Sequence, residues 1–192
     1  MWLRKRPSPP KPLPDDDAVQ KVALHIDVTI RPATAEDLPK LEWYGQFTHF
    51  RRLFEETYRD QLQGRRLMLV ADVNGFPIGQ VFVSLEGGLF DFNGAGPHGY
   101  LYALRVMEPF QRQGLGTALV EAAEGRLRAL GYRRVTIAVA KDNEGALRLY
   151  TRLGYHIYQE DQGRWHYVDH VGKVHYVEEP CWLMEKMLDA DR

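Results

Sequence analysis

The sequence predicts an α/β (α+β) domain in which strands are arranged around one long amphipathic helix. Residues 100–106 alternate as a pleated strand does. After Gly116 the apolar residues recur at steps of three and four over residues 115–130, as they do on one face of a helix. Residues 133–140 (Arg-Arg-Val-Thr-Ile-Ala-Val-Ala) are typical of a buried strand. Strand, turn, helix and strand therefore follow one another in the middle of the chain.

Composition indicates an ordinary globular domain. The chain has 192 residues, of which 44% are hydrophobic and 27% charged, and its formal net charge is -1. This balance does not indicate nucleic acid or a membrane as a partner. The single cysteine, Cys181, excludes an internal disulfide and fits a reducing compartment. We therefore expect a cytoplasmic protein.

The N-terminal residues 1–25 are predicted to form a disordered or extended tail. Residues 1–17 of this tail are rich in proline and end in a run of acids at residues 15–17, so they cannot bury enough apolar surface to offset the entropy of ordering. The basic start at residues 4–6 is not followed by the apolar run of a secretory signal. We expect the folded domain to span residues 26–192.

The first half of that domain is predicted to contain three strands and a helical region. The strands are expected at residues 26–31, 67–73 and 78–84, the last two joined by a hairpin turn at Asn74-Gly75. The helical region is expected to begin after a Thr34 cap and to run to Leu62, with a break near Gly45. Its aromatic residues are interpreted mainly as core, the alternative being that some line an acceptor pocket; they are Trp43, Tyr44, Phe47, Phe50, Phe54 and Tyr58.

A glycine turn at the start of the long helix has the properties of an anion site. Gly114 and Gly116 allow close approach to backbone N–H groups, and the first helical turn leaves such groups without partners at the positive end of the helix dipole. No acidic side chain follows until Glu121, which favours an external phosphate. The spacing is neither that of a dinucleotide fingerprint nor that of a phosphate loop with its lysine.

A second pattern occupies residues 142–155. Either Asp142 or Asn143 can cap a short helix, and Gly154 can close it. Glu144 and Arg148 are spaced as a favourable ion pair.

Together these two patterns resemble the GNAT superfamily of acyl-CoA-dependent N-acetyltransferases. Residues 111–116 (Gln-Arg-Gln-Gly-Leu-Gly) are similar to the Gln/Arg-x-x-Gly-x-Gly/Ala signature, and residues 143–155 are similar to the Asn-x-x-Ala-x-x-x-Tyr-x-x-x-Gly-Phe/Tyr signature. The resemblance covers about residues 30–187. It implies a mixed, mostly antiparallel central sheet flanked by helices and splayed between its fourth and fifth strands, with acetyl-CoA in the gap as co-substrate. It is also consistent with a homodimer.

The resemblance also implies roles for individual residues. Backbone groups at the glycine turn would meet the diphosphate, the pantetheine arm would pair with the preceding strand, and Asn143 would contact that arm. The implied cofactor-binding residues are Leu104, Val106, Gln111, Arg112, Gln113, Gly114, Leu115, Gly116, Thr117 and Asn143. Tyr150 is implied as the catalytic proton donor to the departing thiolate, since a phenol is protonated at neutral pH.

The general base is not evident. Many family members place a glutamate on the strand before the glycine turn, where this chain has Tyr100 and Tyr102. The remaining candidates are Glu42, Glu86, Asp91 and His98.

An insert at residues 161–179 is longer than the family pattern requires. His166 and His170 have helical metal-pair spacing, but flanking glycines and alternating aromatics favour strands, and no cysteine or carboxylate has a familiar ligand spacing. We expect no metal site. The insert is interpreted as an aromatic hairpin that packs on the acceptor site or on a second subunit.

The sequence thus predicts an N-acetyltransferase that acts on an amine of a small molecule or a protein. The alternatives are a non-catalytic acyl-CoA-binding or sensor module, motivated by the missing base, and a structural interaction domain.

Overall fold

The computed structural model describes residues 25–86 and 98–188. The predicted tail, apart from residue 25, lies outside the described residues, as does Asp91. The proposed division of the chain at residue 26 therefore stays a prediction. No helix in the described ranges is both long and apolar enough to cross a membrane.

Within the described residues a seven-stranded sheet has the order β1-β2-β3-β4-β5-β9-β6, and β7 and β8 form a separate two-stranded sheet. The strands are β1 (Thr29–Pro32), β2 (Arg66–Val73), β3 (Phe76–Ser84), β4 (Gly99–Val106), β5 (Arg134–Ala140), β6 (His156–Asp161), β7 (Arg164–Val168), β8 (Val174–Glu178) and β9 (Cys181–Met187). The α-helices are α1 (Arg51–Leu62), α2 (Leu115–Ala129) and α3 (Glu144–Arg152).

The large sheet is antiparallel except where β4 meets β5. These two strands run parallel and pair over only three positions, Gly99–Val135, Tyr100–Thr136 and Leu101–Ile137. Beyond Leu101 the strands separate, so the carboxyl half of β4 is paired with β3 alone. This confirms the predicted fold class and the splay between the fourth and fifth strands.

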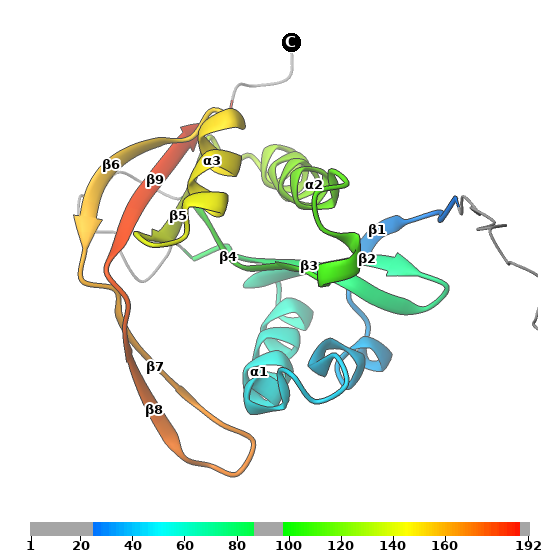
Figure 1. Ribbon diagram of the computed structural model, residues 1–192. Helices are drawn as coiled ribbons and strands as arrows, with labels where there is room; N and C mark the ends of the chain where they lie inside the picture. The colour runs from blue at the N-terminus through cyan, green and yellow to red at the C-terminus, as the bar shows by residue number, and fades with distance from the viewer. Residues whose placement is uncertain (1–24, 87–97, 189–192) are drawn as a thin grey trace, which may run out of the picture.

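Helices cover both faces of the sheet. Figure 1 shows α2 and α3 on one face and α1 on the other. Two cores result: one packs Leu119, Ala123 and Leu127 of α2 against the sheet, and the other packs α1 and the segment before it against β2 and β3. Tyr150 of α3 belongs to the first core.

The helical region predicted from Thr34 to Leu62 is less regular than expected. It consists of three short 3₁₀ turns, η1 (Ala35–Asp37), η2 (Lys40–Glu42) and η3 (Thr48–Phe50), followed by α1. Trp43 and Tyr44 both have positive φ (43° and 58°), which a continuous right-handed helix does not allow. The first strand also begins three residues later than predicted, at Thr29.

A bulge in β4 corrects one further expectation. Simple alternation places Tyr100, Tyr102, Leu104 and Val106 on one face, but the pairing with β3 is irregular between Gln80 and Phe82, and Ala103 has a φ of 52°. The extra residue reverses the alternation. As a result, Tyr102 packs in the α1 core whereas Leu104 and Val106 pack in the α2 core.

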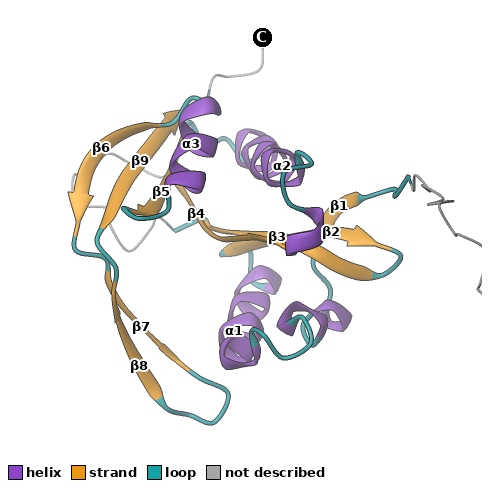
Figure 2. Cartoon of the chain, in the orientation of Figure 1, coloured by secondary structure: helices purple, strands orange, loops and turns teal. Residues whose placement is uncertain are grey.

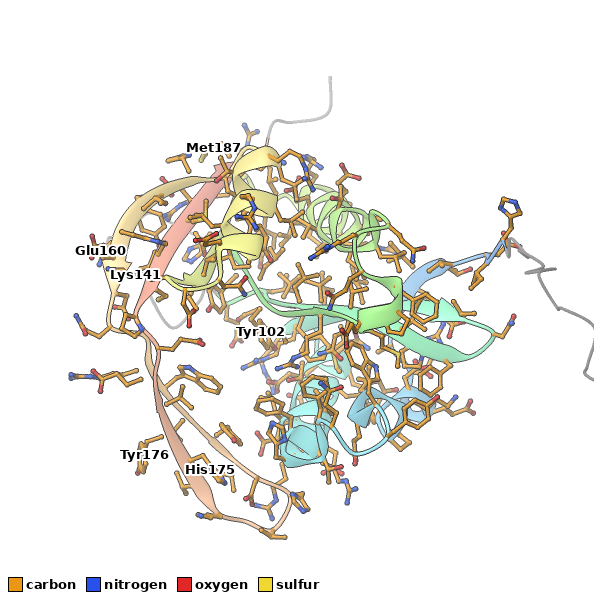
Figure 3. The ribbon with its side chains drawn as sticks, viewed as in Figure 1. Tyr102, Lys141, Glu160, His175, Tyr176 and Met187 are labelled. Carbon is orange, nitrogen blue, oxygen red and sulfur yellow. The ribbon has the colours of Figure 1, made fainter. Side chains whose placement is uncertain are left out.

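The 161–179 insert contains the predicted hairpin, formed by β7 and β8 (Figure 2). Its inner face packs Trp165 and Tyr167 against the α1 core. Tyr176 on the outer face is 84% exposed. Figure 3 shows Tyr176 directed away from the body of the molecule. The hairpin therefore packs beside η3 and α1, and its packing on an acceptor site or on a second subunit stays a prediction.

Candidate active site

Two glutamine side chains stabilise the turn before α2, one by bonding to the end of β4 and one by bonding within the turn. The Gln111 amide donates to the Val106 carbonyl at 2.9 Å, and the Gln113 amide donates to the Pro109 carbonyl at 3.1 Å. Arg112 and Gly114 both have positive φ, 60° and 88°. Successive residues of alternating handedness turn their N–H groups toward the same side, which is the geometry of an anion-binding nest.

The first turn of α2 presents N–H groups to which the helix offers no acceptor. The earliest main-chain bond of the helix is donated by Ala118 N–H to the Gly114 carbonyl, at 3.0 Å. The N–H groups of Leu115, Gly116 and Thr117 precede it, and the first turn contains no acid. The N-terminal end of α2, called the mouth of α2 below, is thus rich in N–H donors and lies at the positive end of the helix dipole.

Arg152 brings a cation to this mouth that the sequence reasoning did not single out. Its Nη2 lies 3.5 Å from the Thr117 hydroxyl, so the last turn of α3 reaches the first turn of α2. The cue in the sequence was the position of Arg152 two residues after Tyr150. Its charge reinforces the attraction of the α2 mouth for an anion.

The carboxyl half of β4 offers backbone groups to the gap. Met107 N–H donates to the Ile78 carbonyl, on the β3 side, at 2.8 Å. Because backbone groups of successive strand residues point to opposite edges, those of Val106 and Leu104 face away from β3, toward the separating β5. Both predicted residues therefore border the gap through their main chains.

The start of α3 and Tyr150 approach the same gap. Asn143, not Asp142, caps α3, since its side-chain oxygen accepts from Ala146 N–H at 3.0 Å. The Tyr150 side chain is buried, its ring contacts Tyr155 edge-on at 5.3 Å, and burial raises the pKa of its phenol above the usual value, with a smaller contribution from Tyr100. Tyr150 therefore keeps its proton well above neutral pH, close to the strand that borders the gap.

Two tyrosines of β4 lie on the α1 face of the sheet. Tyr100 and Tyr102 stack with ring centroids 6.0 Å apart, and the Tyr102 hydroxyl accepts from Arg66 at 2.6 Å. Arg66 also pairs with Asp60 at 3.0 Å. Figure 3 shows Tyr102 in the interior, between the sheet and α1.

The candidate bases differ in their surroundings. Glu42 accepts from Arg51 at 2.5 Å and from Thr48 at 2.7 Å, and the Arg51 contact holds its pKa below the usual value. A carboxylate held in this way is a weak base. Glu86 is exposed and His98 is buried.

The hairpin contains an Asp–His pair that sequence spacing did not reveal. Asp169 lies 2.8 Å from His175 Nε2 and also accepts from the N–H groups of Val171 and Lys173. His166 is on strand β7 and not on a helix, as predicted. Among the described residues, no group of three or more His, Cys, Asp or Glu side chains is placed to hold a metal ion.

Comparison with known proteins agrees with this geometry. Residues 33–155 match the family model described as Acetyltransferase (GNAT) family. The chain belongs to the GNAT acetyltransferase family. The match contains β4, the glycine turn, α2 and α3, and therefore every site residue described above except those of the hairpin.

Solved GNAT structures have the same fold. The ribosomal-protein-S18-alanine N-acetyltransferase of Escherichia coli is 22% identical, with a TM-score of 0.63 over 86% of this chain and 97% of that chain. Ard1 of Thermoplasma volcanium is 19% identical, with a TM-score of 0.65 over 84% and 98%. Arabidopsis thaliana NAA60 in complex with acetyl-CoA is 19% identical, with a TM-score of 0.63 over 84% and 99%. The likeness establishes the GNAT fold across the described domain.

Proposed function

We propose that this GNAT chain transfers the acetyl group of acetyl-CoA to an amine of a small molecule or a protein. The observation that carries the proposal is the donor-rich mouth of α2, which adjoins the unpaired edge of β4 at the splay of the sheet. Similar structures support the choice of co-substrate, since NAA60 and yncA from Salmonella typhimurium were solved with acetyl-CoA and PaiA from Thermoplasma acidophilum with coenzyme A. The predicted cytoplasmic location and homodimer stay predictions.

The residues of the mouth suit the diphosphate. Backbone N–H groups from Arg112 to Thr117 would donate to it, while the Arg112 and Arg152 side chains add positive charge. A Cβ at Gly114 would meet nothing within 4 Å, so the described residues leave space beside this glycine. The mouth would therefore accommodate the charged end of the co-substrate.

The edge of β4 suits the amide-bearing arm. Leu104 and Val106 present main-chain donors and acceptors that a parallel strand would otherwise satisfy, so an arm with two amides can pair there. The Val106 carbonyl already accepts from Gln111, but a carbonyl oxygen has two lone pairs and can accept a second bond. Asn143 uses its side-chain oxygen as the helix cap, which leaves its NH₂ group to contact the arm.

The chemistry then requires two proton movements. Acetyl-CoA supplies an acyl group activated as a thioester. The acceptor amine must lose a proton before it attacks, and the sulfur that departs must gain one. We assign this donor role to Tyr150, and the burial that keeps its phenol protonated supports the assignment.

Replacement of Tyr150 by Phe tests this assignment. We expect the transfer rate, measured with labelled acetyl-CoA and a panel of amines, to fall by roughly 100-fold or more, which is the usual contribution of a positioned acid. Coenzyme A affinity, measured by calorimetry, should stay the same. Tyr176→Phe, at an exposed position on the hairpin, serves as the matched control. Transfer by Tyr150→Phe at the wild-type rate, at neutral and alkaline pH, would show that Tyr150 is not the donor.

A non-catalytic acyl-CoA-binding module is the second candidate. It is favoured by the state of the carboxylates on the α1 face, where Glu42, Asp60 and Asp169 are each held by a cation or by backbone donors. Tight coenzyme binding without turnover over a broad amine panel would support this alternative.

A further inference from the structure

Arg105, in the carboxyl half of β4, is a partly buried cation without an ionic partner among the described residues. Its Nη1 is inaccessible to solvent and makes no hydrogen bond. Within residues 25–86 and 98–188, no carboxylate forms an ion pair with it. The other guanidinium groups near this face differ, since Arg66 pairs with Asp60 and Arg51 pairs with Glu42.

Aromatic rings hold the guanidinium in place. Its central carbon lies 4.6 Å from the centroid of Phe47 and 4.8 Å from that of Phe50, both of which belong to the segment around η3. Such contacts recover part of the cost of desolvating the cation but satisfy none of its N–H groups. Burial lowers the pKa of Arg105 to about 10, so the group is still fully charged at neutral pH.

The carboxylates near Arg105 already have other partners. His49 interacts electrostatically with Arg105 and with Asp169, while Glu42 interacts with His170 and is bound by Arg51. Asp169 is already used by His175 and two backbone N–H groups. The corner formed by η3, β4 and the hairpin thus contains the Arg105 charge but, among the described residues, no carboxylate bound to it.

Arg105 lies at this corner and is also next in sequence to a residue that borders the gap between β4 and β5. It follows Leu104, whose backbone faces the gap, and the bulge at Ala103 places its side chain on the α1 face with Tyr102. Tyr167 of the hairpin contacts Phe50 at 4.9 Å, so the hairpin closes over the same rings that support the guanidinium. An acceptor that approaches between the hairpin and β4 passes Arg105.

We propose that Arg105 determines acceptor specificity by binding a carboxylate that the acceptor carries in addition to its amine. The inference rests on the proposed acetyltransferase function and deepens it. A planar guanidinium matches a carboxylate through two parallel N–H···O bonds, and a ligand carboxylate would supply the counter-charge that residues 25–86 and 98–188 do not provide. The carboxylate comes either from a free amino acid or from an acidic side chain near the amino terminus of a peptide.

Matched acceptors test the proposal. Full-length protein with labelled acetyl-CoA is offered ω-amino acids of increasing length beside their carboxamides, and peptides with Glu beside peptides with Gln at the second position. We expect at least one carboxylate acceptor to exceed its amide in kcat/KM by roughly 10- to 100-fold, the usual range for a hydrogen bond to a charged group. The series that shows the preference identifies the source of the carboxylate, which is either a free amino acid or an acidic side chain of a peptide.

Two variants of Arg105 and one control variant test whether Arg105 causes the carboxylate preference. Arg105→Met keeps a long apolar side chain over the rings and should abolish the preference, while Arg105→Lys should retain part of it. Arg148→Gln, on the exposed face of α3, should leave it unchanged. Coenzyme A affinity should be equal in all four proteins, which confirms that Arg105→Met is folded. An equal carboxylate preference in wild type and Arg105→Met, or no preference in wild type, would overturn the proposal.

Binding without turnover separates this proposal from the proposed function. If no amine is acetylated, the shift in melting temperature caused by the same carboxylates and amides is measured with coenzyme A present. Stabilisation by carboxylates that is lost in Arg105→Met would support the carboxylate subsite while refuting acetyl transfer. No stabilisation by any carboxylate would refute the subsite.

Discussion

At Gly114, one added negative charge should raise the stability of the free protein and lower its affinity for coenzyme A. Its φ of 88° is unfavourable for any other residue, yet a Cβ there would meet nothing within 4 Å. Replacement by Ala or Glu therefore adds the same backbone strain, about 1–2 kcal/mol, without a steric clash. The two variants differ only in what the side chain brings to the mouth of α2.

The magnitude for Gly114→Glu follows from Coulomb's law. A carboxylate about 6 Å from a phosphate charge repels it by about 0.7 kcal/mol in water and about 3 kcal/mol at an effective dielectric constant near 20. We therefore expect coenzyme A to bind the Glu variant roughly 3- to 100-fold more weakly than the Ala variant. In the free protein the same carboxylate interacts favourably with the helix dipole, so the Glu variant should be about 0.3–1 kcal/mol more stable than the Ala variant.

Calorimetric titration with coenzyme A and urea unfolding of the free proteins measure the two effects. The repulsion should weaken as salt is raised, because the mouth is exposed to solvent. Equal coenzyme affinity for the Ala and Glu variants, at low salt and with both proteins folded, would contradict the placement of the diphosphate at residues 112–117.

Two further predictions concern stability. In Gly99→Ala the added Cβ would lie 2.5 Å from both terminal methyl carbons of Leu127, so we expect a loss of about 1–3 kcal/mol in urea unfolding. Combining it with Leu127→Ala should cost less than the sum of the two single changes, and strict additivity would refute this packing. The buried phenols of Tyr100, Tyr150 and Tyr155 all have raised pKa values, chiefly through burial. Their contribution to stability is complete below the unfolded pKa of about 10 and is lost as pH rises above it, by about 1.4 kcal/mol per pH unit for each phenol still protonated in the fold. Tyr155→Phe should reduce this slope by one such increment, whereas exposed Tyr176→Phe should leave it unchanged. Equal slopes in wild type and both variants would disprove the contribution of the Tyr155 phenol.

Features encoded by neighbouring residues could be predicted from the sequence. Asn74-Gly75 forms the expected hairpin turn with φ values of 51° and 80°, because these residue types tolerate that conformation better than others. Asn143 caps α3 through a bond to Ala146, three residues away. The glycine turn and the acid-free start of α2 are likewise local properties.

Features set by distant pairing could not be predicted. Ala103 adopts a positive φ although alanine carries no signal for it, because the register of β4 on β3 forces an extra residue at that point. Simple alternation therefore did not predict that Tyr102 and Leu104 lie on opposite faces of β4. The environment of Arg105 was hidden for the same reason, since the two rings that support it come from residues 47 and 50.

The bulge at Ala103 determines which residues in the second half of β4 lie on each face of the sheet. Removal of this extra residue would leave Leu104 opposite Val81 and would keep both faces beyond it unchanged, because Tyr102 and Leu104 already lie on opposite faces. If the strand instead kept every residue and paired without the bulge, the two faces beyond it would be exchanged. The charged group of Arg105 would then be driven against the leucines of α2, and Val106 would take its place beside Phe47 and Phe50. One residue with a positive φ therefore keeps the Arg105 charge out of the α2 core.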